Sequence, residues 1–355
     1  MTKLKEKLKR LIEATGPISV AEYMAHCLLD PEFGYYTTRE PFGTEGDFIT
    51  APEISQMFGE LIGVWIYSRW KSAGSPRNPI IAEIGPGRGT LMKDLLRTVS
   101  RLDPAFAREA RFALVEASSR LIEVQKRTLA EAARTISLEW YDRFEALPLG
   151  PLFIVGNELF DALPMRQFVK TANGWRERVV GLDEQGELAF FAGAAGLDAN
   201  ALPPGVTGTP EGSVMEISPA REALMDVIAE RLGRQGGAGL FIDYGYERSG
   251  VGDTLQAVRR HAYDDVLAHP GEADVTSHVD FEALARVARR HGLATALTTQ
   301  GDFLLGLGLL ERAGRLGAGK SETVQESIRD AVERLAGPDQ MGTLFKVLMV
   351  TNNPF

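Results

Sequence analysis

The sequence predicts an α/β fold built on a doubly wound sheet of mainly parallel strands, and two observations carry this prediction. Residues 80–84 are largely apolar and run directly into a glycine-rich turn at 85–89, which a stretch with apolar side chains at helical spacing follows. This is the strand, turn and helix that open nucleotide-binding α/β folds. The alternation continues, with strands expected at 111–116, 136–140 and 152–156 and helices at 90–102 and 117–133.

The composition is that of an enzyme with a large core, and it excludes several kinds of partner. The chain has 355 residues, which suggests about two domains, and 44% of them are hydrophobic. A formal net charge of −9 argues against binding to a nucleic-acid backbone. No apolar run is long enough to span a bilayer, so membrane insertion is not expected. The single cysteine, Cys27, and the scattered histidines predict neither a disulfide nor a metal site.

The N-terminal residues predict a solvated helix. Residues 2–12 are basic and amphipathic, and they lack the apolar core of a signal peptide. We therefore expect neither a signal nor a transit peptide, and a cytoplasmic protein.

Residues 1–75 are expected to form a helical segment that covers the site, and 76–355 the main domain. Ser19 and Glu22 have the spacing of a capping box, which predicts the start of a second helix. Thr50 and Glu53 repeat that spacing and open a helix expected to reach Trp70. Glu53 is either a cap residue or a ligand-binding residue, and the sequence leaves both readings open.

The main domain is expected to carry a β-hairpin insertion at about 165–215. Two alternating stretches, 167–170 and 175–180, flank Asn173-Gly174, which is a strong hairpin turn. A third strand is expected at 188–191. The remaining predictions are a surface loop at 192–212, a polar loop at 247–276, strands at 240–243, 293–299 and 344–350, and helices at 281–290, 302–315 and 321–336.

The glycine-rich turn indicates which nucleotide the sheet binds. Its spacing is Gly-x-Gly-x-Gly, whereas the dinucleotide fingerprint is Gly-x-Gly-x-x-Gly. Glu116 ends the second strand, where a carboxylate accepts hydrogen bonds from ribose hydroxyls. Glu83 precedes the turn, and its charge would repel a pyrophosphate but attract a sulfonium or an ammonium group. We therefore expect S-adenosylmethionine rather than NAD.

Three further polar positions follow predicted strands or start a predicted helix. Asp142 follows the third strand, where it either accepts from an adenine amino group or belongs to an ordinary strand-to-loop transition. After the fourth strand, Asn157, Glu158 and Asp161 occupy five residues at the edge where ligands of doubly wound sheets lie. His278 is a candidate proton acceptor because the ordinary pKa of histidine suits that role, but a surface residue at a helix start is equally consistent.

Five segments in the same order resemble the MidA-like proteins over nearly the whole chain. They are Gly46–Ser55, Glu83–Gly89, Gly156–Pro164, Phe241–Gly245 and Asp274–Phe281. The mitochondrial members of that family are arginine methyltransferases that help to assemble respiratory complex I. The resemblance implies a seven-stranded, Rossmann-like class I methyltransferase fold with an antiparallel last strand, and S-adenosylmethionine as cofactor. It also implies a protein acceptor, an arginine in a complex I subunit of the 49-kDa type.

The resemblance also assigns roles to residues. Glu158 and Asp161 would hold the guanidinium of the acceptor in a bidentate grip, and His278 would take the proton after transfer. Asp47 and Glu53 would close the site. The predicted cofactor-binding residues are Glu83, Gly85, Pro86, Gly87, Gly89, Glu116, Asp142, Asn157, Asp47, Thr50 and Glu53.

Other functions stay open at this point. A small-molecule O- or N-methyltransferase would need an enclosed apolar pocket, whereas a peptide acceptor needs an open acidic groove. A non-catalytic assembly factor would bind the cofactor for stability alone. The turn spacing and Glu83 disfavour an NAD-dependent oxidoreductase. The hairpin insertion offers a surface for a homodimer.

Overall fold

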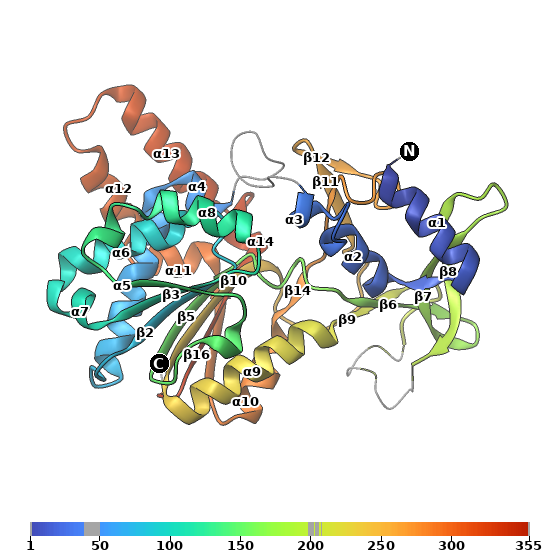
Figure 1. The fold of residues 1–355 in the computed structure, drawn as a ribbon, viewed down its shortest axis with the longest axis horizontal. Coiled ribbons are helices and arrows are strands. Elements are labelled where there is room, and N and C mark those ends of the chain that lie inside the picture. Colours follow the sequence, from blue (N-terminus) through green and yellow to red (C-terminus); the bar gives the residue numbers. More distant parts are fainter. Residues whose placement is uncertain (1, 39–49, 198–201, 203–205, 207, 354–355) are drawn as a thin grey trace. The chain divides into compact units, whose positions relative to one another are not determined.

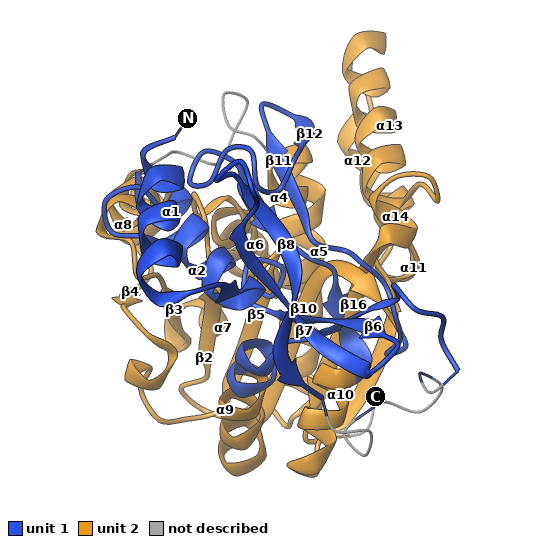
Figure 2. Cartoon of the chain, turned by 90° about the vertical axis from the view of Figure 1, so that its right-hand side faces the viewer, with its two compact units in different colours: residues 1–48, 160–224, 248–282 blue, residues 49–159, 225–247, 283–355 orange. Residues whose placement is uncertain are grey.

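The computed structural model describes residues 2–38, 50–197, 202, 206 and 208–353. It divides into two compact units, each made of three stretches of chain (Figure 2). Unit 1 comprises residues 1–48, 160–224 and 248–282, and unit 2 comprises 49–159, 225–247 and 283–355. These units differ from the expected division at residue 75, which stays a prediction.

Unit 2 contains the predicted sheet. Its main path has seven strands in the order β15-β16-β10-β5-β2-β3-β4. Strands β2, β3, β4, β5 and β10 run parallel, and β16 runs antiparallel to both β10 and β15. The expected doubly wound sheet with an antiparallel last strand is confirmed. The bounds are β2 Ile80–Ile84, β3 Arg111–Val115, β4 Leu138–Tyr141, β5 Leu152–Asn157, β10 Gly237–Tyr246, β15 Ala294–Thr299 and β16 Phe345–Thr351.

Helices cover both faces of this sheet, with α5 and α6 over one face and α9 and α10 over the other (Figure 1). Helix α5 lies close to α6 because Gly59 has no side chain: a Cβ there would come within 2.8 Å of Asp94 Cβ. The helices of unit 2 are α4 Ala51–Ile54, α5 Gln56–Ser72, α6 Thr90–Leu102, α7 Pro104–Glu109, α8 Ser119–Thr128, α10 Phe281–Arg290, α11 Gln300–Gly306, α12 Leu309–Gly317, α13 Glu322–Ala336 and α14 Met341–Leu344. Two 3₁₀ turns, η1 Ala132–Arg134 and η2 Phe144–Ala146, complete it, and α9 (Pro219–Gln235) and α10 each begin in unit 1.

Two predicted helices are each broken in two. The helix expected from Thr50 to Trp70 is interrupted at Ser55, whose backbone is extended and whose hydroxyl caps α5 by accepting from Met57 N–H. The helix expected at 302–315 is interrupted at Gly308, which has φ +89° and separates α11 from α12. In both cases a short-range cap prevails over a continuous apolar periodicity.

Unit 1 joins the N-terminal helices to the hairpin insertion. Helix α2 begins with the predicted capping box, in which Ser19 and Glu22 each accept from the other's backbone N–H. The insertion forms a sheet with the path β1-β7-β6-β9, to which β8 adds by pairing with β7. The bounds are α1 Lys3–Thr15, β1 Ile18–Ser19, α2 Val20–Leu29, α3 Tyr35–Thr38, β6 Arg166–Thr171, β7 Gly174–Leu182, β8 Leu188–Gly196 and β9 Val214–Ile217.

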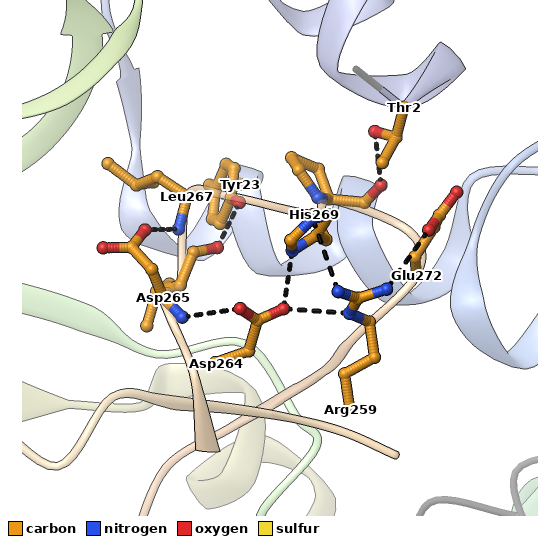
Figure 3. Close-up of polar contacts among 10 residues, drawn as sticks. Thr2, Tyr23, Arg259, Asp264, Asp265, Leu267, His269 and Glu272 are labelled. Atoms are coloured by element: carbon orange, nitrogen blue, oxygen red, sulfur yellow. Dashed lines mark hydrogen bonds and ion pairs between the residues drawn. The ribbon is translucent and has the colours of Figure 1, made fainter. Parts of the chain in front are cut away.

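The polar segment 247–276, expected to be a loop, contains a small sheet of three strands, so that expectation is wrong. Strand β11 (Gln256–Arg259) pairs with β12 (Ala262–Asp264) and with β13 (Asp274–Thr276), and the short β14 (Val279–Asp280) follows. Polar side chains fasten the segment after β12 (Figure 3). Asp264 Oδ2 lies 2.7 Å from His269 Nδ1 and 3.1 Å from Arg259 Nε. The segment is ordered by contacts between polar side chains within it, which polar composition alone does not reveal.

Each unit has its own apolar core. In unit 2 the buried residues come from α5, α6 and the strands, as with Phe58, Leu95 and Leu240. In unit 1 they come from α1 and α2 together with the insertion, and Cys27 is among them. Among the described residues no helix combines the length and apolar composition that crossing a bilayer requires.

Candidate functional site

The glycine-rich turn lies where the sequence predicts it, between β2 and α6. Gly85, Gly87 and Gly89 all have positive φ, at +68°, +51° and +81°, a conformation that disfavours side chains. Gly85 N–H donates to Val115 O at 3.1 Å, which fixes the turn to the end of β3. Pro86 is buried. A tight turn with bare backbone therefore stands at the carboxyl edge of the sheet, where doubly wound folds bind ligands.

Glu83 is a buried carboxylate with spare capacity for hydrogen bonds. Its side chain accepts from Met92 N–H in the first turn of α6, while Oε2 is buried with no hydrogen-bond partner. Burial raises the pKa of Glu83 to about 8. A carboxylate that is buried without a full set of donors favours a cationic or hydrogen-bond-donating ligand.

Asn157 provides a second unpartnered acceptor on the neighbouring strand. Strand β5 pairs with β2 so that Val155 lies opposite Glu83, which puts Asn157, two residues on, on the same face of the sheet as Glu83. Asn157 Oδ1 is buried and has no hydrogen-bond partner. Two orphaned oxygens at adjacent strand ends suit an ammonium group, which carries one positive charge and three N–H donors. The amino-acid end of S-adenosylmethionine is such a group, so these residues fit the predicted cofactor.

Glu116 follows β3 and is held by its neighbours. Ser118 N–H donates to Oε1 at 2.8 Å, and Gln125 Nε2 donates to Oε2 at 3.1 Å. Burial raises the pKa of Glu116, and these hydrogen bonds oppose that rise. An acceptor held in this way at the end of the second strand is suited to the two hydroxyls of a ribose.

Gln125 is a residue of this site that sequence reasoning missed. It is fully buried in α8, and its Nε2 donates both to Gly87 O at 2.9 Å and to Glu116. Its Oε1 accepts from Trp140 Nε1 at 3.0 Å. One side chain thus connects the glycine turn, the β3 carboxylate and β4. Only its burial in the fold marks this residue, since every polar group of a buried side chain must find a partner.

The remaining predicted cofactor residues are less closely connected. Asp142 is exposed directly after β4. Thr50 occupies the N-cap position of α4 but makes no side-chain cap. Glu53 Oε1 accepts from the Thr90 hydroxyl at 2.5 Å, so this carboxylate bonds to the start of α6. Asp47 lies outside the described residues.

Glu158 has an unusual backbone. Its φ is +49°, in the left-handed region that residues with side chains seldom occupy. Its N–H donates to Ile242 O at 2.8 Å, and Asn157 Nδ2 donates to its Oε1 at 3.0 Å. Such strain persists only where the surroundings enforce it, and it concentrates at functional sites.

Asp161 and His278 both belong to unit 1, and the structure brings their backbones together. Ser277 N–H donates to Asp161 O at 3.2 Å. Asp161 is buried, with 6% of its surface exposed, and His278 is half-buried. His278 does not start a helix: it precedes β14, and α10 begins only at Phe281. Glu158 belongs to unit 2, because the boundary between the units falls between Leu159 and Phe160.

A buried arginine, which the sequence analysis did not consider, links these two backbones. Arg221 is 4% exposed and donates to His278 O at 2.7 Å and to Asp161 O at 2.9 Å. It also donates to Ser277 O at 3.2 Å and to Ser277 Oγ at 2.6 Å.

The order of the strands, the glycine turn, the carboxyl group of Glu83 in β2 and that of Glu116 after β3 together define a class I methyltransferase. In agreement, residues 61–299 match a family model described as "Putative S-adenosyl-L-methionine-dependent methyltransferase". The chain belongs to that family. S-Adenosylmethionine is its cofactor, and methyl transfer is its chemistry.

Curated relatives and a solved structure extend over nearly the whole chain. The protein arginine methyltransferase NDUFAF7 of Xenopus tropicalis is 35% identical, covering 96% of this chain and 83% of the relative. The protein of the same name from Homo sapiens is 34% identical, covering 97% and 82%. A crystal structure from Burkholderia thailandensis, bound to S-adenosyl-homocysteine, is similar with a TM-score of 0.85 and 28% identity, covering 98% of this chain and 91% of that one.

These relatives correct one expectation. Both NDUFAF7 proteins are named as mitochondrial. The cytoplasmic location inferred from the N-terminal residues is therefore wrong. The basic, amphipathic character of the first helix does not report on location. It reflects the packing of this helix in the core of unit 1, where Leu4, Leu8 and Ile12 are buried.

Proposed function

We propose that this protein is an arginine N-methyltransferase whose acceptor is a protein, and that the acceptor is a complex I subunit of the 49-kDa type. Two supports carry the assignment of arginine. The relatives in this family are named protein arginine methyltransferases. The strained Glu158, fixed by its backbone bond to β10 and by Asn157, supplies a carboxylate in a set position at the sheet edge.

The cofactor is held by the residues of unit 2. Glu83 and Asn157 receive the ammonium group, Glu116 receives the ribose, and the bare turn at 85–89 allows close approach of the backbone. Bound there, S-adenosylmethionine supplies an electrophilic methyl group on a cationic sulfur. The raised pKa of Glu83 means that this residue gives up a proton when a cation binds beside it near neutral pH.

The acceptor is a guanidinium, which stays protonated at any physiological pH and is a weak nucleophile. Glu158 orients it by charge-assisted hydrogen bonds, so that one nitrogen faces the methyl group, and Asp161 keeps its predicted role as a carboxylate for the acceptor. That nitrogen forms the new N–C bond as the S–C bond breaks, and it then loses one proton. His278 accepts the proton. Alignment of this kind supplies up to roughly 7–11 kcal/mol of the barrier reduction.

The experiment is transfer of labelled methyl from S-adenosylmethionine into an extract from cells that lack the gene, followed by hydrolysis of labelled bands to amino acids. Labelled methylarginine in one protein supports the proposal. Label in small molecules alone would replace it with a small-molecule methyltransferase. Absence of label, with cofactor binding demonstrated in parallel, would leave a non-catalytic assembly factor.

The Glu158→Gln variant tests the assigned role directly. We expect the rate of transfer to fall at least about 100-fold, because the bidentate, charge-assisted grip is lost, while the Kd for the cofactor changes little. Glu187→Gln is the matched control, since Glu187 is an exposed partner of Lys5 and Lys9 in unit 1. Full activity of Glu158→Gln would remove Glu158 from the mechanism.

A further inference from the structure

Helix α9 contains two buried arginines, and neither is held in the usual way. Arg221 is 4% exposed and Arg231 is 9% exposed. Within the part of the chain that the structure describes, both guanidinium groups donate to carbonyl and hydroxyl oxygens, and in both the buried Nε has no partner. Burying a charge without a carboxylate in direct contact costs free energy, so we ask which structural or functional role offsets that cost for each side chain.

The two arginines differ in what they hold. Arg231 donates to Leu147 O and Pro148 O, two successive residues of one loop in unit 2. Arg221 donates to the backbone of Asp161 and to the backbones of Ser277 and His278, all in unit 1. Asp161 lies more than a hundred residues before the other two in the sequence. Arg231 therefore anchors one loop, whereas Arg221 fixes the distance between two segments, one with Asp161 and the other with Ser277 and His278.

The second polar group of the His278 backbone is also fixed by a side chain, that of the half-buried Thr254. His278 N–H donates to Thr254 Oγ1 at 2.9 Å. That hydroxyl donates in turn to Glu216 Oε2 at 2.5 Å, and Gln167 donates to Glu216 Oε1 at 2.8 Å. Both the N–H and the C=O of His278 are thus held, one by Thr254 and one by Arg221.

We propose that Arg221 is a positioning residue for methyl transfer: it locks the main chain of Asp161 to that of His278, so that the carboxylate and the imidazole keep a fixed separation. This inference rests on the proposed function, which gives Asp161 and His278 their roles. A planar guanidinium with several N–H donors is suited to holding carbonyls from two segments at once, which the single ammonium of lysine cannot reproduce.

The test compares Arg221→Met with Arg231→Met, two variants that remove the same kind of group from the same helix. Both are expected to lower the midpoint of unfolding. At a temperature where both are folded, we expect kcat of Arg221→Met to fall about 30-fold or more, because a misplacement of about 1 Å costs about 100-fold. Its KM for S-adenosylmethionine should stay within threefold of the parent, and Arg231→Met should keep its kcat. Arg221→Lys should behave like Arg221→Met.

A kcat of Arg221→Met within threefold of that of Arg231→Met would overturn the proposal, because the loss would then be structural. Hydrogen exchange gives a readout that needs no acceptor. The amides of Ser277 and His278 should exchange at least tenfold faster in Arg221→Met and be unchanged in Arg231→Met; unchanged exchange in both variants also overturns it. If the parent protein methylates no protein but the exchange result is as expected, the proposed function is wrong, while the role of Arg221 in fixing the backbones of Asp161 and His278 is supported.

Discussion

The cofactor edge of unit 2 is stabilised by one kind of contact, and the loops around Asp161 and His278 in unit 1 are stabilised by another. At the cofactor edge, Glu83, the glycine turn, Glu116 and Gln125 lie within residues 80–128 on successive strands and helices, and Asn157 joins them from β5. In unit 1, the partners of His278 and Asp161 come from α9 and from the segment after residue 247, where Thr254 is itself held by Glu216 of β9. The first region is assembled by neighbours in the sequence and the second by distant segments.

The difference predicts separable effects. Changes at the cofactor edge should alter the affinity for S-adenosylmethionine, because that edge presents acceptors to the cofactor. Changes in the unit 1 loops should alter kcat, because they move groups assigned to the acceptor and to the proton. Three substitutions test this separation, in addition to those described above.

Glu83→Gln should have the largest effect. Because burial raises the pKa of Glu83 to about 8, a cation binds more tightly as the pH rises toward 8, by about tenfold per pH unit, with release of one proton. The variant should lose this pH dependence and bind S-adenosylmethionine weakly throughout. Calorimetry in buffers of different ionisation enthalpy measures both quantities.

The stability of the ligand-free protein gives the same carboxyl a second test. Its folded pKa is raised above the ordinary value of 4.5, so stability falls as the pH rises from about 4.5 to 8, by on the order of 5 kcal/mol. Glu83→Gln should abolish that fall. Glu60 is the control: burial alone would raise its pKa, but Arg312 and Arg97 hold it below the usual range. Its contribution is therefore lost as the pH falls, and Glu60→Gln should leave the cofactor's pH dependence intact.

Gln125→Leu should have an intermediate effect. It removes the hydrogen bonds to Gly87 and Glu116 and leaves Trp140 Nε1 without its acceptor. Three groups thus lose a partner, and if about 2 kcal/mol of that cost falls on cofactor binding, the Kd for S-adenosylmethionine rises roughly 30-fold. Gln300→Leu is a matched control, since Gln300 is equally buried but donates to Leu335 O in another part of unit 2. An equal change of Kd in the two variants would mean that Gln125 acts through stability alone.

Ser277→Ala should have the smallest effect, and it should change kcat rather than the Kd for the cofactor. It removes one hydroxyl that accepts from Arg221 at 2.6 Å and leaves the backbone bonds to Asp161 and His278 in place. We expect kcat to fall a few-fold and the unfolding free energy to fall by about 1 kcal/mol, with the Kd for the cofactor unchanged. A change of Kd without a change of kcat would contradict the separation drawn between the two regions.

The same difference explains how much was predictable from sequence. The strands at 80–84, 111–116 and 152–156 were predicted within a residue or so, because buried parallel strands are apolar runs ended by turns. The number of strands and the antiparallel direction of the last one were predicted from the family resemblance. The breaks at Ser55 and Gly308 were missed, since a single cap interrupts a helix without disturbing its apolar periodicity.

The site was predicted unevenly for a physical reason. Glu83 and Glu116 stand next to recognisable strand ends, so their placement follows from local pattern. Gln125 and Arg221 lie on amphipathic helices, where one polar residue among many carries no local signal, and their roles depend on partners brought near by the fold. The sheet at 256–276 was missed for another reason: its strands are short and polar, although the contacts of Asp264 with His269 and Arg259 are local in sequence.

The position of β16 bears on how the protein is made. This strand is the last of the seven in sequence, yet it lies between β10 and β15 and pairs with both. During synthesis on a ribosome, β15 therefore has no neighbour in the sheet until residues 345–351 have left the exit tunnel. Until then the edge of β10 stands open to any other extended chain. A nascent chain stalled before residue 345 is thus a species for which a chaperone that shields strand edges would be needed.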